Sequence, residues 1–235
     1  MTLDSADRVY SSPRTLARYV RCHFSGDDPC DYFRQVAAMV PDDADVVVDL
    51  GSNVGRSTFD AAAKARFVLG LDIAHEAIRV ASELARGEAV AYDAALEGGA
   101  TERRTVRRPE TSGLVAFAVA DAARPPVRDG VADAVLLLNL IDRLPRPRAA
   151  IEAAARLLRP GGVLVLTDPF TWLEEFTPRE EWLGGAAGVR AAIEAAGLAI
   201  EEERDVTLVI RDHARRVETV TPRLFKARRR GGGSS

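Results

Sequence analysis

Short apolar segments alternate with amphipathic segments along most of the chain from about residue 45. The apolar segments are rich in Val, Leu and Ile, and they cover residues 45–50, 66–72, 114–121, 132–140 and 163–168. The amphipathic segments have helical spacing, and they cover residues 52–65, 74–87 and 147–162. Continuously apolar strands separated by helices are typical of a parallel sheet that is covered on both faces. The pattern therefore predicts a doubly wound, Rossmann-like α/β domain.

Four segments lie outside this repeat. Residues 188–203 are predicted to form a late helix that leads into a strand. Residues 9–40 contain two predicted helices, at about 13–24 and 31–40. Residues 87–113 carry glycines and the run RRTVRRP, which predicts an exposed insertion between strands. Residues 217–227 alternate between apolar and polar positions, which predicts an antiparallel edge strand.

No Gly-, Pro- or Ser-rich linker divides the chain, so we expect one domain with an added N-terminal part. Residues 1–44 are predicted to form a helical extension that caps the substrate, and residues 45–228 the core. Residues 229–235, which include GGGSS, are predicted to be a disordered tail.

Composition excludes several classes of protein. The 235 residues are 47% hydrophobic and 29% charged, with a net charge of −3, which argues against a disordered chain. No apolar stretch approaches the roughly 18 residues of a membrane-spanning helix, and the first residues lack the apolar core of a signal peptide. Acids outnumber bases, 35 to 32, so the arginines do not predict nucleic-acid binding. Two cysteines and three scattered histidines predict neither a disulfide framework nor a metal site, and we expect a cytoplasmic protein.

The turn after the first predicted strand, VVVDLGSNVGRST, indicates the kind of ligand. It lacks the glycine spacing of a dinucleotide fingerprint and the Gly-Lys-Ser/Thr of a phosphate-binding loop. Asp49 ends the strand, and its carboxylate would repel a pyrophosphate by about 1–4 kcal/mol at a separation of ~4 Å. S-adenosylmethionine carries an ammonium, a sulfonium and no phosphate, so it suits Asp49 better.

Two further acids follow the next strands. Asp72 can accept both hydroxyl hydrogens of a ribose, and Asp121, followed by Ala122, can accept from an adenine amine. The alternative is that each acid only caps the helix after it. The predicted cofactor-binding residues are Asp49, Gly51, Ser52, Asn53, Gly55, Arg56, Ser57, Asp72, Ile73, Asp121, Ala122, Asn139 and Leu140.

Two segments are candidates for binding the methyl acceptor. Asn139 follows the fourth predicted strand, and its amide can orient a nitrogen of the acceptor. Residues 167–185 hold two tryptophans, two phenylalanines and several acids, while Pro169 and Pro178 forbid a long helix. This loop predicts an aromatic and acidic lid over a small zwitterionic substrate with a flat ring. The alternative is that its aromatic residues only pack the loop onto the domain.

The constellation of acids, together with LLRPGGVLVLTDP at 157–169, resembles the class I S-adenosylmethionine-dependent methyltransferases. A narrower resemblance is to the 4-mercaptohistidine N1-methyltransferase family of ovothiol biosynthesis. It is carried by RVYSSPRTLARYVRCHFSG, DLGSNVGRSTFD, NLIDRLP, TDPFTWLEEFTPREEWLGG and VIRDHARRVETVTPRLFKA. The resemblance implies a seven-stranded sheet and methylation of an imidazole nitrogen of 5-thiolated histidine, giving ovothiol A. It also implies a stand-alone form, to which a separate sulfur-inserting enzyme supplies the substrate.

For that reaction we expect Asn139, Tyr19 and His23 to hold the ring. Substrate ammonium is expected at Glu174 or Glu175, and substrate carboxylate at Arg14, Arg56 or Arg211; His23 and His213 are candidates for receiving the ring proton. The predicted substrate-binding residues are Tyr10, Arg14, Tyr19, His23, Phe170, Trp172, Glu174, Glu175 and Arg211. Two alternatives remain open. One is methylation of another small thiol, selenol or amine, such as the selenium analogue of the thiolated histidine, and the other is a non-catalytic protein that binds S-adenosylmethionine.

Overall fold

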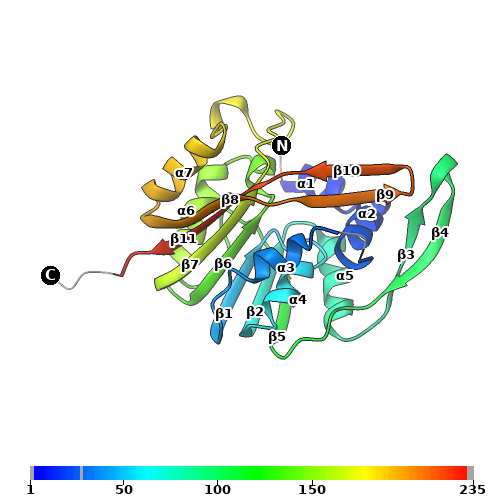
Figure 1. The fold of residues 1–235 in the computed structure, drawn as a ribbon, viewed down its shortest axis with the longest axis horizontal. Helices are drawn as coiled ribbons and strands as arrows, with labels where there is room; N and C mark the ends of the chain where they lie inside the picture. Colours follow the sequence, from blue (N-terminus) through cyan, green and yellow to red (C-terminus); the bar gives the residue numbers. More distant parts are fainter. Residues whose placement is uncertain (1–2, 27–28, 232–235) are drawn as a thin grey trace.

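The computed structural model describes residues 3–26 and 29–231 (Figure 1). The helices are α1 (Leu3–Tyr10), α2 (Pro13–Phe24), α3 (Tyr32–Ala37), α4 (Arg56–Ala61), α5 (His75–Ala85), α6 (Pro147–Leu157) and α7 (Ala186–Ala195). The strands are β1 (Ala44–Leu50), β2 (Ala65–Asp72), β3 (Val90–Ala95), β4 (Thr101–Val106), β5 (Leu114–Val119), β6 (Ala132–Leu138), β7 (Leu158–Asp168), β8 (Leu198–Asp205), β9 (Leu208–His213), β10 (Arg216–Val220) and β11 (Arg223–Arg229). Short 3₁₀ turns lie at Glu97–Gly99, Ile141–Arg143 and Arg179–Glu181.

A seven-stranded sheet forms the centre of the fold, in the order β5-β2-β1-β6-β7-β11-β8. The first five of these strands are parallel, and β11 runs antiparallel to both of its neighbours. Strand order reverses between β1 and β6, which places the carboxyl ends of β1, β2 and β6 around one crevice. The predicted doubly wound α/β fold with seven strands is confirmed.

Both faces of the sheet are covered, because its central strands are apolar on both sides. Residues of α6 and α7, among them Ile151 and Ile193, pack on one face. Residues of α3 and α4, among them Val36 and Ala61, pack on the other. A third cluster joins α2 and α5 to the β3–β4 hairpin. The core is therefore continuous from the sheet into the N-terminal helices.

The prediction of one edge strand over residues 217–227 is wrong. Pro222 cannot donate a ladder hydrogen bond, and the segment divides there into β10 and β11. Strand β10 pairs with β9 as a separate hairpin, whereas β11 lies between β7 and β8 inside the sheet. Leu224 and Phe225 of β11 are fully buried, one on each face, which is typical of an interior strand.

Other boundaries differ from the predicted ones for local reasons. Helix α4 begins only at Arg56 because the preceding residues form the turn after β1, and helix α1 was not predicted. The insertion at 87–113 contains the β3–β4 hairpin, one face of which packs through Val90 and Tyr92 against the N-terminal helices. Strand β11 extends to Arg229, the first residue of the predicted tail, and residues 232–235 lie outside the described residues.

Figure 1 shows β9 and β10 running side by side away from the sheet toward the β3–β4 hairpin. Arg215, in the turn between β9 and β10, forms an ion pair with Glu97, in the turn between β3 and β4. Arg18 of α2 forms ion pairs with Asp212 and Glu218 of the β9–β10 hairpin. The two hairpins and α2 therefore form one cover beside the crevice. Within the described ranges, no helix combines the length and the apolar character that crossing a membrane requires.

Candidate functional site

A cavity of about 320 Å³ opens at the carboxyl ends of the parallel strands. Its floor is the turn after β1 together with the residues that follow β2, β5 and β6. Its cover comes from α1, α2, α3 and the β9–β10 hairpin, through Tyr10, Tyr19, Tyr32 and Ile210 among others. One cavity therefore joins the predicted ligand turn to the N-terminal extension.

The turn after β1 depends on backbone conformations that few residues adopt. Gly51 and Gly55 have φ values of 80° and 90°, and Asn53 has a φ of 49°. Asparagine tolerates this left-handed region better than most residues with a side chain, so Asn53 fits the place between the two glycines. The Gly51 N–H donates to the Leu71 carbonyl at 2.7 Å, which ties the turn to β2.

The packing beside this turn depends on two positions that lack a side chain. A Cβ atom on Gly55 would lie 2.6 Å from the ring of Phe117, and a Cβ atom on Gly70 would lie 2.5 Å from the same ring. Phe117 of β5 therefore occupies the space that the two missing side chains leave. The absent side chain at Gly70 also leaves room for the Ser52 hydroxyl, which a Cβ would meet at 2.9 Å.

Buried polar groups around the turn match a ligand with a cationic head and a diol. The Ser52 Oγ atom is buried and has no hydrogen-bond partner among the described residues, so a ligand hydroxyl or carboxylate can satisfy it. The Asp72 carboxylate accepts the backbone N–H groups of Asn53 and Ala74, each at 2.8 Å, and lines the cavity. Asp49 is 1% exposed, and burial raises its pKa to about 7 although Thr58 donates a hydrogen bond to it. A nearby cation would favour the ionised form of Asp49. These groups fit S-adenosylmethionine.

Nearly all the predicted cofactor-binding residues meet in this cavity. Gly55 and Arg56 are the exceptions, because Gly55 packs on Phe117 and Arg56 is held by Asp60 and by the His23 carbonyl. The residues that line the cavity are Asp49, Gly51, Ser52, Asn53, Ser57, Asp72, Ile73, Asp121, Ala122, Asn139 and Leu140. Asp121 also accepts the Ala123 backbone N–H at 2.9 Å, so it has a capping role as well.

The side of the cavity toward the N-terminal helices holds some of the predicted acceptor residues. Tyr10, Tyr19, His23 and Asn139 line it. Burial, assisted by the Arg56 charge, lowers the pKa of His23 to about 3. The His23 ring is therefore neutral at pH 7 and a poor proton acceptor, while its buried Nδ1 atom has no hydrogen-bond partner among the described residues. In this position His23 is suited to hydrogen bonding with a ligand.

Several predicted acceptor residues do not line the cavity. Arg14 is exposed on the outer side of α2, and Glu174 and Glu175 are exposed in the loop after β7. Arg211 and His213 lie on β9 but do not contribute to the lining. Alternation along β9 explains their absence, because Leu208 and Ile210 take the inward positions.

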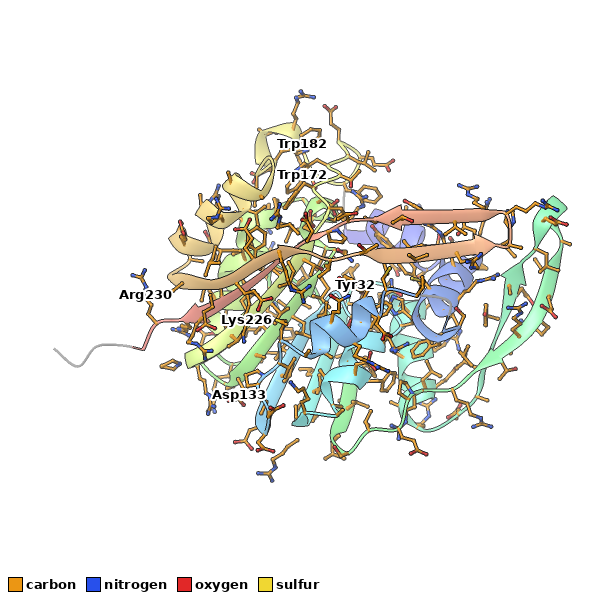
Figure 2. All side chains as sticks on the ribbon, viewed as in Figure 1. Tyr32, Asp133, Trp172, Trp182, Lys226 and Arg230 are labelled. Carbon is orange, nitrogen blue, oxygen red and sulfur yellow. The ribbon has the colours of Figure 1, made fainter. Side chains whose placement is uncertain are left out.

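The aromatic loop at 167–185 folds mainly on itself. The rings of Trp172 and Trp182 stack with their centroids 6.3 Å apart, and Figure 2 shows the two side chains close together above the sheet. Their N–H groups donate to loop carbonyls, those of Gly184 and Thr177. Phe170 and Trp172 pack against the core, so Pro169 and Thr171 are the parts of this described loop that line the cavity. This arrangement agrees with the alternative that the aromatic residues brace the loop.

Sequence reasoning missed several lining residues. Tyr32, Arg18, Asp142, Arg143 and Glu218 all contribute to the cavity. Arg143 lies over the Phe176 ring at 5.4 Å and forms an ion pair with the buried Asp142. These residues come from segments that meet only in the folded chain, and nothing in their local sequence distinguishes them from ordinary surface or core positions.

Comparisons with known proteins agree with this geometry. A family profile described as "Methyltransferase domain" matches residues 48–166. The chain is similar in structure to the [4+2]-cyclase SpnF, with a TM-score of 0.68 and 18% identity over 98% of this chain and 97% of that one. It is also similar to the N-methyltransferase NodS from Bradyrhizobium japonicum WM9 in complex with S-adenosyl-L-homocysteine, with a TM-score of 0.61 and 14% identity over 93% of this chain and 99% of that one.

A third similar structure is described as "Conversion of a Disulfide Bond into a Thioacetal Group during Echinomycin Biosynthesis". Its TM-score is 0.63, with 20% identity over 99% of this chain and 94% of that one. No curated protein sequence matches the chain. Among the described residues, no group of His, Cys, Asp and Glu side chains is placed to hold a metal ion.

Proposed function

The chain belongs to the methyltransferase domain family, and we propose that it methylates an imidazole nitrogen of 5-thiolated histidine, the last step of ovothiol A formation. It is an S-adenosylmethionine-dependent methyltransferase, and the finer assignment of the acceptor is the proposal. The observation that carries the proposal is one cavity that the Asn139 side chain and the neutral His23 ring line together with the glycine turn. A flat, nitrogen-containing acceptor suits both of these groups.

The bound cofactor supplies an electrophilic methyl group on a sulfonium. For this chain the remaining task is positioning, because an imidazole nitrogen already has a lone pair. Holding two reactants in line contributes about 7–11 kcal/mol to lowering a barrier. Asp49, Ser52 and Asp72 hold the cofactor side, while Asn139, Tyr19 and His23 orient the acceptor.

Charged residues at the acceptor side are suited to an amino-acid substrate. Arg18 and Arg143 provide guanidinium groups, and Asp142 and Glu218 provide carboxylates, all within the cavity lining. A substrate carboxylate has donors at the arginines, and a substrate ammonium has acceptors at the acids. These residues replace Arg14, Glu174 and Glu175 in the proposal, because those three lie outside the cavity.

The test is a mass-spectrometric assay of the purified chain with S-adenosylmethionine and a panel of acceptors. The panel contains 5-thiolated histidine, its selenium analogue, histidine and simple thiols. We expect a product heavier by one CH₂ unit from 5-thiolated histidine, with the methyl group on a ring nitrogen by NMR. Absence of that product overturns the acceptor assignment, and an S-methyl product overturns the proposed orientation of the ring.

A further inference from the structure

Three polar side chains form a closed ring of hydrogen bonds beside the cavity. The Asn139 Nδ2 atom donates to the Tyr32 hydroxyl at 3.0 Å, and the Thr167 hydroxyl donates to Asn139 Oδ1 at 3.2 Å. The Tyr32 and Thr167 oxygens lie 2.6 Å apart, which closes the ring. Tyr32 begins α3, Asn139 follows β6 and Thr167 lies near the end of β7, so three separate segments meet here.

Counting hydrogens gives this ring a direction. Thr167 has one hydroxyl hydrogen, and that hydrogen goes to Asn139. The contact between the two hydroxyl oxygens therefore uses the Tyr32 hydrogen, with Thr167 as the acceptor. Burial raises the pKa of Tyr32, so the phenol keeps its hydrogen at neutral pH. All three hydrogen bonds then point the same way around the ring, and each strengthens the next.

The surroundings keep the ring fixed. Tyr32 is 1% exposed and Thr167 is fully buried, and Figure 2 shows Tyr32 where α3 meets the central strands. The Asn139 backbone is held as well, because its N–H donates to the Thr167 carbonyl at 2.7 Å and its φ is 49°. Turning the Asn139 amide away would leave the buried Thr167 hydroxyl hydrogen without its acceptor, at about 1–3 kcal/mol.

The ring leaves half of the Asn139 amide unused. Nδ2 carries two hydrogens and Oδ1 two lone pairs, and the ring takes one of each. Among the described residues, none takes the second hydrogen or the second lone pair, and Asn139 lines the cavity. The amide therefore presents one donor and one acceptor, in a fixed orientation, to whatever occupies the acceptor side.

We propose that Tyr32 and Thr167 are positioning residues that fix the Asn139 amide and so select which atom of the acceptor faces the methyl donor. This inference rests on the proposed function, in which Asn139 binds the acceptor ring. A thiolated imidazole offers a sulfur and ring nitrogens as competing nucleophiles. An amide that cannot rotate holds the edge of such a ring in one way, and the product is then a single N-methyl isomer.

The experiment compares variants that remove one hydroxyl and keep the shape of the side chain. Tyr32→Phe and Thr167→Val break the ring of hydrogen bonds, whereas Thr167→Ser keeps the hydroxyl of residue 167. With S-adenosylmethionine and 5-thiolated histidine, we expect wild type and Thr167→Ser to give one N-methyl product. In the two broken variants we expect kcat to fall about 10- to 100-fold, because a small misplacement of the acceptor has that effect on rate. We also expect an S-methyl product to form, while calorimetry gives the wild-type affinity for S-adenosylmethionine.

The matched control is Tyr92→Phe, which removes a phenol hydroxyl from a buried tyrosine outside the cavity. It is expected to give the wild-type rate and the single product. Wild-type kcat and a single product from Tyr32→Phe overturn the proposal. An equal loss in Thr167→Ser also overturns it, because that variant retains the hydroxyl that the ring needs.

A readout without any acceptor separates this inference from the proposed function. The side-chain amide signals of Asn139, assigned by their loss in Asn139→Ala, report the hydrogen that Tyr32 holds. We expect this hydrogen to exchange with solvent about tenfold faster in Tyr32→Phe than in wild type, because exchange follows local opening. Wild type that does not methylate 5-thiolated histidine, together with faster exchange in Tyr32→Phe, would overturn the proposed function. The positioning of the Asn139 amide by the hydrogen-bond ring would still be supported. Equal exchange rates of this hydrogen in Tyr32→Phe and wild type would overturn the proposed hydrogen-bond ring, whichever acceptor the enzyme methylates.

Discussion

The Asp72 carboxylate accepts a hydrogen bond from the Asn53 backbone N–H at 2.8 Å, across the crevice between β2 and the turn after β1. Its other oxygen accepts the Ala74 N–H, also at 2.8 Å. The Ile73 N–H also bonds to this carboxylate, which has about four acceptor positions, and Asp72 lines the cavity, so one residue braces the turn and keeps an acceptor position for a ligand hydroxyl.

Removing the Asp72 carboxylate is expected to impair cofactor binding. Asp72→Ala should weaken the affinity for S-adenosylmethionine about 100-fold, and Asp72→Asn about tenfold, because the amide keeps one acceptor oxygen. Titration calorimetry measures both. Asp129→Asn is the matched control, since Asp129 is a surface acid paired with Arg156 and should bind as wild type does. Wild-type affinity in Asp72→Ala would exclude Asp72 from the cofactor site.

Cofactor affinity is expected to rise with pH because of Asp49. Burial raises the pKa of Asp49 to about 7, so its carboxylate is mostly protonated at pH 5.5 and half ionised at pH 7. Only the ionised form attracts the cofactor ammonium, and the affinity should rise roughly tenfold over that interval. Asp49→Asn should bind more weakly and lose this dependence. A pH profile of Asp49→Asn that parallels wild type would assign the titration to another group.

The free energy of unfolding of the ligand-free protein is expected to fall as pH rises, whereas the cofactor affinity is expected to rise. Burial raises the folded-state pKa values of Asp49 and Asp72. The stability that their protonated carboxyl groups contribute is therefore present at about pH 4 and is lost as pH rises through the folded-state pKa values. For Asp49 the loss amounts to at most about 4 kcal/mol. Urea unfolding at pH 5.5 and pH 8 should therefore show a less stable protein at pH 8, with a smaller difference in Asp49→Asn. An equal change of stability with pH in wild type and Asp49→Asn would contradict the burial of an ionised Asp49.

Gly70→Ala is expected to close the crevice from below. The added methyl would meet Phe117 at 2.5 Å and Ser52 Oγ at 2.9 Å, so one of the two side chains must shift. We expect a loss of about 1–3 kcal/mol in the free energy of unfolding and weaker cofactor binding. Gly185→Ala is the control, because a Cβ there meets nothing within 4 Å. Equal cofactor affinity in the two variants would contradict the expectation that the added methyl disturbs the cofactor site.

The stacked tryptophans are expected to stabilise the loop after β7 without touching the cofactor. Trp172→Leu removes the stack on Trp182 and the hydrogen bond to the Gly184 carbonyl, which should cost about 1–2 kcal/mol of stability. The affinity for S-adenosylmethionine should not change, because neither ring lines the cavity. Both tryptophans of the chain lie in this loop, so intrinsic fluorescence reports its unfolding. A loss of cofactor affinity in Trp172→Leu would place the loop in the cofactor site.

The sequence predicted the parallel half of the sheet well, and most of the residues that it proposes for the cofactor line one cavity. Both depend on local signals, namely apolar runs such as 45–50 and an acid at the end of a strand, such as Asp49 or Asp72. Strand periodicity carries those signals directly, and the glycine turn needs residues that adopt positive φ. The structure agrees at these strands and at the glycine turn because apolar periodicity and positive φ depend only on neighbouring residues.

The acceptor side could not be predicted in the same way, because distant segments build it. Tyr32 and Thr167 are separated by 135 positions and meet through a hydrogen bond between side chains. Glu174 was a reasonable candidate from composition, yet the tryptophans turn its loop onto itself and leave it exposed. Strand β11 was missed as an interior strand because alternation alone does not reveal which strands will flank it.

The position of β11 also constrains the order in which the chain folds. Among the described strands, β8 pairs only with β11, which follows it after the β9–β10 hairpin. During synthesis, β8 therefore has no partner until residues 223–229 emerge, and β7 presents an open edge over the same interval. Unpaired edges promote association with other chains, so this stage is where nascent copies are most prone to aggregate.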